Sequence, residues 1–200
     1  RSTKGTILMK RLLSFLTVLL LLIPTAVDAS STKVNNIGIT CQIDQNGTAT
    51  FVEKWDMDVS EGTEGYKIFN GMNDQPLTLI GVTDDRGVTY KNIGTWDSDV
   101  SRESKINKCG LIKDGGHYEL CFGLGDYGTR SYTMVYQIEH FVNQYKDQQG
   151  INYAFISDMS LDVADVTIHV TGMTPYSKEN AKIWAFGYSG SVNFDNGGVT

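Results

Sequence analysis

Cysteine is scarce in this sequence of 200 residues, which contains three. Three thiols are too few for the dense disulfide framework of small exported domains, although they allow one bridge. Cys109 and Cys121 flank a pair of glycines at 115 and 116, and this spacing lets two antiparallel strands place them opposite each other. They are therefore the candidate disulfide. The alternative is that all three cysteines are small buried hydrophobic residues, and Cys41 is expected in the core.

Long apolar runs are scarce too, since no stretch reaches the roughly 20 residues that a membrane-spanning helix requires. One run of 12 residues, from Leu12 to Ile23, is apolar apart from a serine and a threonine. It follows Lys10 and Arg11, and small residues lie at the end of the segment, where signal peptidase requires them. This order is typical of a secretory signal peptide that is cleaved after Ala29.

The sequence thus divides into three parts. Residues 9–29 are predicted to be the signal peptide, in helical form, and residues 1–8 precede the first methionine and are set aside as an upstream or added segment. Residues 30–200 are expected to form one secreted, extracellular domain.

Basic residues are few in that domain, where 13 lysines and arginines face 22 acidic residues and give a net charge of −9. Nucleic acid is therefore not an expected partner, because non-specific binding depends on lysine and arginine contacts with phosphates. An anionic membrane surface is disfavoured for the same reason. The domain is long enough to bury about 70% of its unfolded surface, so it needs neither a metal nor many disulfides for stability.

Helical periodicity is missing as well, and short strands between turn signals take its place. The clearest strand runs from Thr48 to Val59, where apolar and polar side chains alternate. The Asn-Gly pair in Asp44 to Gly47 favours a tight turn and joins residues 37–43 to this strand as a hairpin. Two more hairpins and a further strand are expected at 77–83 with 88–93, at 118–122 with 130–140, and at 163–170.

Several short strands at this spacing predict an all-β fold, an antiparallel β-sandwich preceded by the signal peptide helix. At the C-terminal end, a strand begins at 191–194 and a turn follows at 195–198, but the returning strand is not completed. Because an unfinished sandwich exposes an open edge, we interpret the domain as truncated at its C-terminus.

No catalytic motif is complete in this sequence. Gly123 to Gly128 spells GxGxxG, but a strand pattern follows it where a dinucleotide site needs a helix, so it is interpreted as a hairpin loop. Asp97 to Asp99 begins like a calcium loop, yet Arg102 and Lys108 stand where glycine and glutamate are needed. Residues 187–191 lack the last glycine of a nucleophile elbow. We predict no catalytic residue, no metal site and no cofactor.

Glu53 breaks the alternation of its strand, because it shares the apolar face with Phe51 and Trp55. An unpaired carboxylate costs several kcal/mol there, or takes up a proton. In one interpretation Glu53 is an acid, base or ligand anchor in a cleft. In the other it is structural and fixed by tyrosine hydroxyls, backbone N–H groups or Lys67. The structural interpretation predicts low exposure and a donor within about 3.2 Å.

Aromatic side chains offer a second candidate surface, because they can stack on sugar rings. Trp96 stands next to a polar stretch and is expected to be exposed, so Trp96, Tyr127 and Glu53 are the candidate ligand-binding residues. Trp55 and Trp184 fall on apolar strand faces and are expected in the core.

Several short motifs occur in a set order along the domain. They are the turn at Asn46-Gly47, Phe51-Val52-Glu53, Gly65-Tyr66-Lys67, the strands at 118–122 and 132–136, Tyr153-Ala154-Phe155, and the segment 183–187 with 192–194. Over about residues 34–200, this order resembles the DUF2207 family of predicted membrane proteins, and the last segment is similar to its Gram-positive members. The resemblance implies an exported β-sandwich ahead of transmembrane helices, and hence a membrane anchor after residue 200. Lys67 and Phe155 depart from the arginine and tryptophan of many members.

These observations together predict a non-catalytic, extracytoplasmic domain of a membrane-anchored bacterial protein. It would face outward at the cell membrane and contact a protein or a cell-envelope component. A carbohydrate or cell-wall ligand-binding module and an exported hydrolase are the alternatives. A concave pocket shared by Glu53 and an exposed aromatic side chain would favour either alternative.

Overall fold

The computed structural model describes residues 31–72, 74–187 and 190–200, so the predicted signal peptide and the segment before it lie outside the described residues. Ser31 to Thr200 form one unit. Strands make up most of its regular structure, and the single helix among the described residues is α2, Arg102–Lys105. The all-β prediction is therefore confirmed for this unit.

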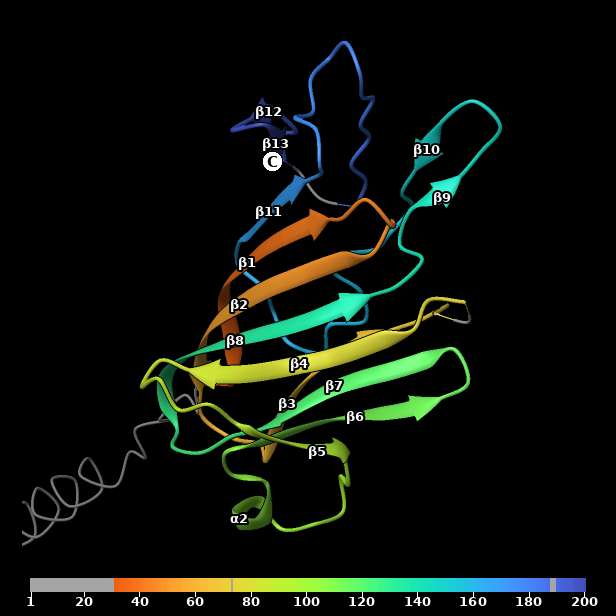
Figure 1. Ribbon diagram of the computed structural model, residues 1–200. Helices are drawn as coiled ribbons and strands as arrows, with labels where there is room; N and C mark the ends of the chain where they lie inside the picture. The colour runs from red at the N-terminus through yellow and green to blue at the C-terminus, as the bar shows by residue number, and fades with distance from the viewer. Residues whose placement is uncertain (1–30, 73, 188–189) are drawn as a thin grey trace, which may run out of the picture. The chain divides into compact units, whose positions relative to one another are not determined.

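The larger sheet has seven strands, with β1 and β2 near its middle (Figure 1). Its neighbours are antiparallel except for β1 and β11, which run parallel from the pair Ile37 and Val166 to the pair Gln42 and Thr171. In spatial order, the strands are β12 (Phe194–Asp195), β13 (Gly198–Val199), β11 (Val166–Thr171), β1 (Lys33–Ile43), β2 (Ala49–Val59), β8 (Gly128–Ile138) and β4 (Leu77–Asp84).

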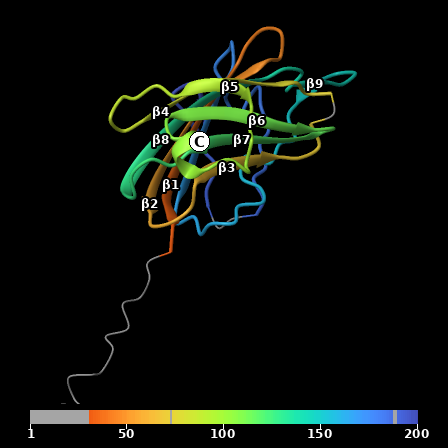
Figure 2. The ribbon, with the colours of Figure 1, turned by 90° about the horizontal axis from the view of Figure 1, so that it is seen from below.

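The smaller sheet has four strands, which Figure 2 shows side by side. In spatial order they are β3 (Glu64–Phe69), β7 (His117–Gly123), β6 (Lys108–Asp114) and β5 (Lys91–Thr95). The pair β5 and β6 is parallel, and the others are antiparallel. A separate two-stranded ribbon consists of β9 (Asn143–Gln144) and β10 (Gln149–Gly150).

The core lies between these two sheets. Alternate residues of β2 and β8 point into it, as their sequence patterns predict, and Trp55, Tyr132 and Tyr136 are fully buried. From the smaller sheet, the ring of Phe122 lies 4.8 Å from that of Tyr132 and 6.2 Å from that of Trp55. Phe69 meets Tyr136 in the same way, with ring centroids 5.3 Å apart. These aromatic contacts across the layers hold the sandwich together.

The strand pairings agree only in part with the expected hairpins. The hairpin of β1 with β2 is confirmed. The return strand after β4 pairs with it only near Thr83 and Thr89, and the chain then crosses to the smaller sheet as β5. The expected pairing of 118–122 with 130–140 is wrong, because β7 lies between β3 and β6 while β8 lies between β2 and β4. The loop at 123–128 is thus a connection between the two sheets and not a hairpin loop. β7 pairs instead with β6, which is nearer in the sequence and is joined to it by the tight turn at Gly115.

Candidate functional site

The carboxylate of Glu53 lies in the middle of the core and has no contact with solvent. Its Oε1 accepts hydrogen bonds from the Trp55 indole at 2.7 Å and from the Lys67 ammonium at 3.0 Å. Its Oε2 accepts one from the Tyr136 hydroxyl at 2.7 Å. The predicted low exposure is therefore confirmed, and so are two of the predicted donors, a tyrosine hydroxyl and Lys67, whereas the Trp55 indole was not among those predicted.

Different elements supply these donors. Trp55 follows two residues later on the same face of β2, and Tyr136 comes from β8, the next strand of the larger sheet. Lys67 comes from β3 in the smaller sheet, is 4% exposed, and also donates to the carbonyl of Phe155 at 2.7 Å. The ion pair between Lys67 and Glu53 thus joins the two sheets of the sandwich across the core.

The surroundings of Glu53 also fix the protonation of its neighbours. Burial and the adjacent Glu53 charge raise the pKa of Tyr136 well above its usual range. Burial raises the pKa of Tyr153 as well, with a smaller contribution from Glu53. Both phenols are therefore neutral at physiological pH, and Tyr136 acts as a hydrogen-bond donor. A carboxylate sealed among three donors matches the structural interpretation of Glu53.

A second paired carboxylate, that of Glu64 at the start of β3, is half-buried and was not found from the sequence. It accepts a hydrogen bond from the Trp96 indole at 2.8 Å and forms an ion pair with Lys105 of α2 at 2.9 Å. Lys105 is 3% exposed and also donates to the carbonyl of Ser98 at 2.7 Å. The polar segment after Trp96 folds back over the indole, and the Trp96 side chain is 4% exposed. The expected exposure of Trp96 is therefore wrong.

Tyr127 is the one exposed member of the three candidate ligand-binding residues. Its hydroxyl donates to the carbonyl of Gly62 at 2.9 Å, and the guanidinium of Arg102 lies 4.5 Å from its ring centroid. Glu53 and Trp96 are buried at two other places, so the structure does not bring the three residues into one pocket. Trp184 was expected in the core and is 71% exposed, because the segment that carries it is not a strand of the sandwich.

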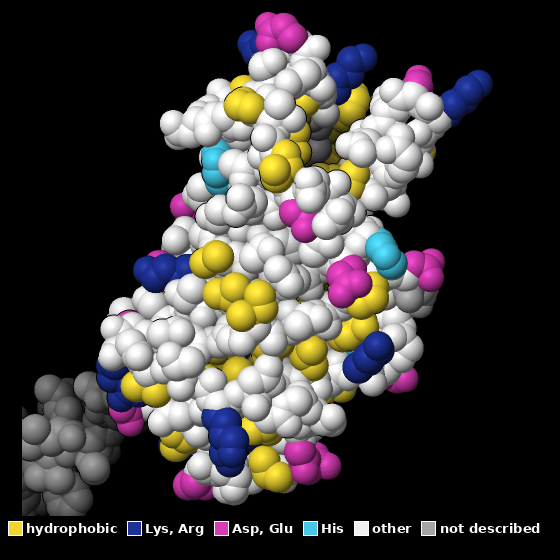
Figure 3. Space-filling model, in the orientation of Figure 1, with side chains coloured by type: hydrophobic (Ala, Val, Ile, Leu, Met, Phe, Trp, Pro, Cys, Tyr) yellow, Lys and Arg dark blue, Asp and Glu magenta, His cyan; other side chains and the backbone are white. Residues whose placement is uncertain are grey.

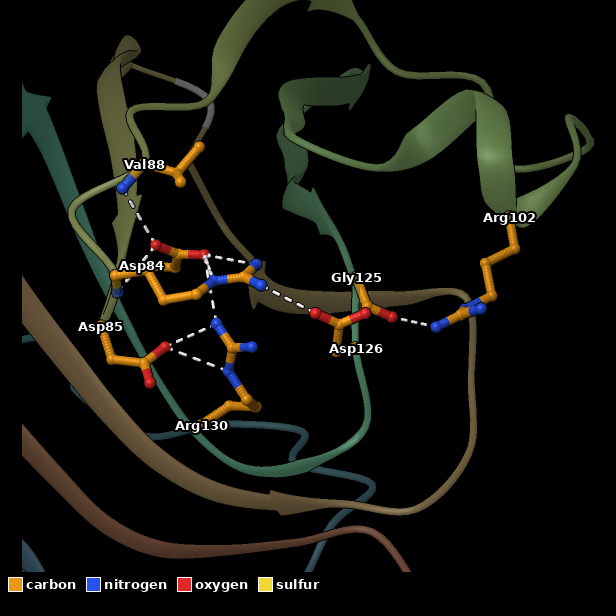
Figure 4. A network of polar contacts seen from close by, with 8 residues as sticks. Asp84, Asp85, Val88, Arg102, Gly125, Asp126 and Arg130 are labelled. Carbon is orange, nitrogen blue, oxygen red and sulfur yellow. Dashed lines mark hydrogen bonds and ion pairs between the residues drawn. The ribbon is translucent and has the colours of Figure 1, made fainter.

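A third polar cluster surrounds Asp84 at the end of β4 (Figure 4). Its carboxylate accepts bonds from the backbone N–H groups of Arg86 and Val88 and from the guanidinium groups of Arg86 and Arg130. Arg130 also pairs with Asp85 at 2.6 Å. Burial acts to raise the pKa of Asp84, but these hydrogen bonds outweigh it and lower the pKa.

This cluster extends to the loop between β7 and β8. Arg86 pairs with Asp126 at 2.7 Å, and Figure 4 shows Arg102 reaching the carbonyl of Gly125 in the same loop. The acidic turn after β4 was recognised in the sequence only as a turn. The signal that identifies the site is the first aspartate of this turn. Its side chain accepts hydrogen bonds from the N–H groups two and four residues later and so fixes the turn locally.

The three cysteines are free thiols and all are buried. The disulfide considered between Cys109 and Cys121 is not formed, because Cys109 lies opposite Phe122 and Cys121 opposite Gly110. An offset of one residue in an antiparallel pair places two side chains on opposite faces of the sheet. Burial raises the pKa of Cys41 to about 12 and that of Cys109 to about 11, so these thiols stay protonated at neutral pH.

Two hollows lie elsewhere on the described surface. A cavity of about 160 Å³ is bordered by β2, β3 and residues 158–161, and an open groove of about 550 Å³ lies beside Trp184. Neither is lined by Glu53 or Tyr127. Within residues 31–72, 74–187 and 190–200, no three side chains of His, Cys, Asp or Glu gather in a way that would hold a metal ion. In the same ranges, no helix has the length and apolar character to cross a bilayer.

Comparison with known proteins gives one match in sequence and several distant ones in structure. The family model described as the N-terminal domain of predicted membrane proteins, DUF2207, matches residues 33–200. No curated protein matches the chain.

The structural matches include large proteins of which this chain spans a minor part. A putative protease from Parabacteroides distasonis has a TM-score of 0.35 at 14% identity, over 74% of this chain and 30% of that one. An M1 zinc metallopeptidase from Deinococcus radiodurans has a TM-score of 0.38 at 9% identity, over 84% of this chain and 38% of that one. Structural similarities this weak indicate neither the fold nor the activity of this chain.

Proposed function

Because this chain belongs to the DUF2207 family of predicted membrane proteins, we propose that it is a non-catalytic domain that faces outward from a membrane. In this proposal the apolar run at 12–23 exports the chain, and an anchor outside residues 31–200 retains it at the cell membrane. The domain then contacts a protein or another cell-envelope component. Its strongly acidic composition favours partners other than nucleic acid.

The enclosure of Glu53 is the observation that supports a non-catalytic role. An acid or base must reach the proton that it transfers, directly or through one water. Glu53 has no solvent exposure, and three protein donors occupy its two oxygens. Glu64 accepts from Trp96 and pairs with Lys105, but it is half-buried and borders the cavity of about 160 Å³. The residues considered for a carbohydrate module lie in three places, so they give that alternative no support.

Protease treatment of intact cells tests the outward orientation. The full-length protein carries an epitope tag on the loop at 145–148, where Tyr145 and its neighbours are exposed. We expect external protease to remove the tag without lysis, while a cytoplasmic control protein stays intact. Protection of the tag until the cells are lysed would contradict the proposed topology.

Substitution of Glu53 tests the non-catalytic part. The purified protein is assayed against peptide, ester and glycan substrates, together with Glu53→Gln. We expect neither protein to exceed the background rate. Hydrolysis by the parent that Glu53→Gln abolishes, with the variant still folded, would show an enzyme instead.

A further inference from the structure

The ion pair of Lys67 and Glu53 is distinguished from surface ion pairs by its burial and not by its length. Its side chains are 5% and 0% exposed, and Nζ lies 3.0 Å from Oε1. The surface pair of Lys54 and Asp56 is shorter, at 2.8 Å, but its side chains are 53% and 32% exposed. Figure 3 shows basic and acidic side chains next to each other on the surface. Water therefore surrounds the surface pairs and is excluded from the pair in the core.

A lysine amine and a glutamate carboxyl group in such contact can condense to an amide. Proton transfer across the 3.0 Å hydrogen bond turns the ammonium and the carboxylate into an amine and a carboxylic acid. The nitrogen lone pair of Lys67 then forms a bond to Cδ of Glu53, and the bond from Cδ to one oxygen breaks. Two of the three ammonium protons leave with this oxygen as water, and the third stays on the amide nitrogen. The reaction therefore needs no other reactant.

The groups around the pair are placed for this reaction. The Trp55 indole donates to Oε1 at 2.7 Å, where it can stabilise the negative charge of a tetrahedral intermediate. The Tyr136 hydroxyl donates to Oε2 at 2.7 Å, the oxygen that leaves as water. Nζ of Lys67 already donates to the carbonyl of Phe155 at 2.7 Å. In the product, Trp55 would bond to the amide oxygen and the amide N–H to Phe155, so both polar groups of the amide have partners.

Burial favours the amide over the ion pair. Two charges in an apolar core lose hydration free energy, which their attraction offsets only in part, whereas an amide carries no charge. The two sheets hold the reacting groups in contact, which gives the reaction a high effective concentration. The exclusion of water also protects the amide from hydrolysis. An exposed ion pair has none of these advantages.

A second lysine–glutamate pair provides a comparison within the same chain. Lys105 and Glu64 lie 2.9 Å apart, and Trp96 donates to Glu64 as Trp55 does to Glu53. The Glu64 side chain is 19% exposed, however, and borders the cavity of about 160 Å³. Because water can reach this carboxylate, we expect the pair to remain ionic.

We propose that Lys67 and Glu53 form an intramolecular isopeptide bond, with Tyr136 and Trp55 as the catalytic groups. Because β3 belongs to the smaller sheet and β2 to the larger one, the bond joins the two layers of the sandwich covalently. Such a link stabilises the domain as a disulfide does, without using a cysteine. The reaction occurs once and acts on the chain itself, so it is independent of the proposed function and of where the domain works.

Tryptic peptide mapping of the folded chain tests this bond. Trypsin cuts an unlinked chain after Lys54 and Lys67. It then releases the peptides 34–54, 55–67 and 68–86. The isopeptide bond blocks cleavage after Lys67, so we expect one branched peptide in which 34–54 is joined to 55–86. Its mass should be lower than the sum of its parts by one water molecule.

Lys67→Arg is the matched variant, because a guanidinium keeps the charge and the hydrogen bonds but is not acylated by a carboxyl group. It should give the separate peptides and a mass without loss of water. Its thermal melting shows that the variant is folded. The recovery of unlinked peptides from the variant and of the branched peptide from the parent would support the proposal.

The rate of bond formation tests the role of Tyr136. Chain purified in urea is diluted into buffer, and the loss of water is followed by mass spectrometry. Tyr136→Phe should slow the reaction about a hundredfold, the effect of removing one donor from a reacting oxygen. Tyr132→Phe is the control, because Tyr132 is fully buried on the same strand, and its replacement should leave the rate unchanged.

Several results would overturn the proposal. One is a folded parent that yields only the unlinked peptides. Another is a branched peptide that persists in Lys67→Arg or that contains Lys105, which would assign the link to a different pair. A loss of water within a single unbranched peptide would indicate a succinimide, for which Asp114 before Gly115 is a suitable site. None of these results affects the protease test in intact cells, so failure of this proposal would leave the proposed function intact.

Discussion

The effect of a substitution at Glu53 on stability depends on the three donors that its carboxylate binds and on the absence of solvent around it. The carboxylate, the Lys67 ammonium and the Trp55 indole form one buried unit, and Glu64 forms a similar unit with Lys105 and Trp96. In each unit a glutamate accepts from one lysine and one tryptophan. The two lysines come from elements other than the strand that carries their carboxylate, so each unit joins separate parts of the domain.

Removal of the Glu53 carboxylate should destabilise the domain strongly. Glu53→Ala leaves the Trp55 and Tyr136 donors without an acceptor and the buried Lys67 ammonium with only the carbonyl of Phe155. Breaking one side of a buried pair costs about 3 to 5 kcal/mol. Glu53→Gln keeps the shape and one acceptor oxygen, so its loss should be smaller than that of Glu53→Ala. Urea denaturation monitored by fluorescence measures both.

Glu139→Gln is the control for this pair, because Glu139 is an exposed glutamate at the end of β8. It should change the free energy of unfolding by less than about 0.5 kcal/mol. Equal stability of the parent and Glu53→Ala would mean that the buried unit contributes nothing, contrary to the geometry.

Asp84 should make stability depend on acidic pH. Its pKa in the folded state is lowered, so its contribution is present above the unfolded pKa of about 3.9 and is lost as the pH falls through the folded value. Asp84→Asn should cost about 1 to 3 kcal/mol at pH 7, because donors around the buried side chain lose their charged acceptor. The difference between parent and variant should shrink towards pH 2. Denaturation at a series of pH values checks this, with exposed Asp147→Asn as the control.

At the scale of the strands, the register of β6 and β7 decides the state of the cysteines. Cys109 and Cys121 point to opposite faces of the sheet, and all three thiols are buried. We expect an aromatic disulfide reagent to titrate no thiol in the native chain at pH 7.5 and three after denaturation. A titre of one in a denatured, unreduced sample would reveal a disulfide and a register different from this one.

The sequence patterns predicted the hairpin of β1 with β2, in which the partner strand follows directly across a tight turn. The Asn-Gly pair before β2 specified the first hairpin, and the alternation in β2 and β8 specified their buried faces. The pairing of β7 with β3, and that of β1 with β11, joins residues far apart in the chain. No local propensity encodes such pairings, because they depend on which sheet edge is left open.

The paired glutamate was predictable in one case and not in the other. Glu53 stands in a long, regular strand, where a charged residue on the apolar face is conspicuous. Glu64 begins a short strand, and its partner Lys105 lies in a polar segment that reads as solvent-exposed. The prediction for Trp184 was wrong in the opposite direction, because this side chain was expected to be buried and is exposed. Local apolar character does not reveal whether another layer of the fold covers a residue.

At the scale of the whole molecule, charge sets a further expectation. Residues 30–200 carry a net charge of −9, so we expect the protein to leave the mobility of duplex DNA and of single-stranded RNA unchanged at 50 mM salt. Gel-shift titration up to micromolar protein measures this. A basic control protein of similar size should shift both under the same conditions, and retention that weakens steeply with salt would refute the expectation.

The parallel pairing of β1 with β11 has a consequence for the order of folding. The first strand of the domain has an incomplete edge until residues 166–171, more than a hundred residues later in the chain, have left the ribosome. Contacts of such wide sequence separation slow folding. A chain that emerges from its N-terminus therefore stays open along β1 until β11 has emerged, and only then can the larger sheet close at this edge.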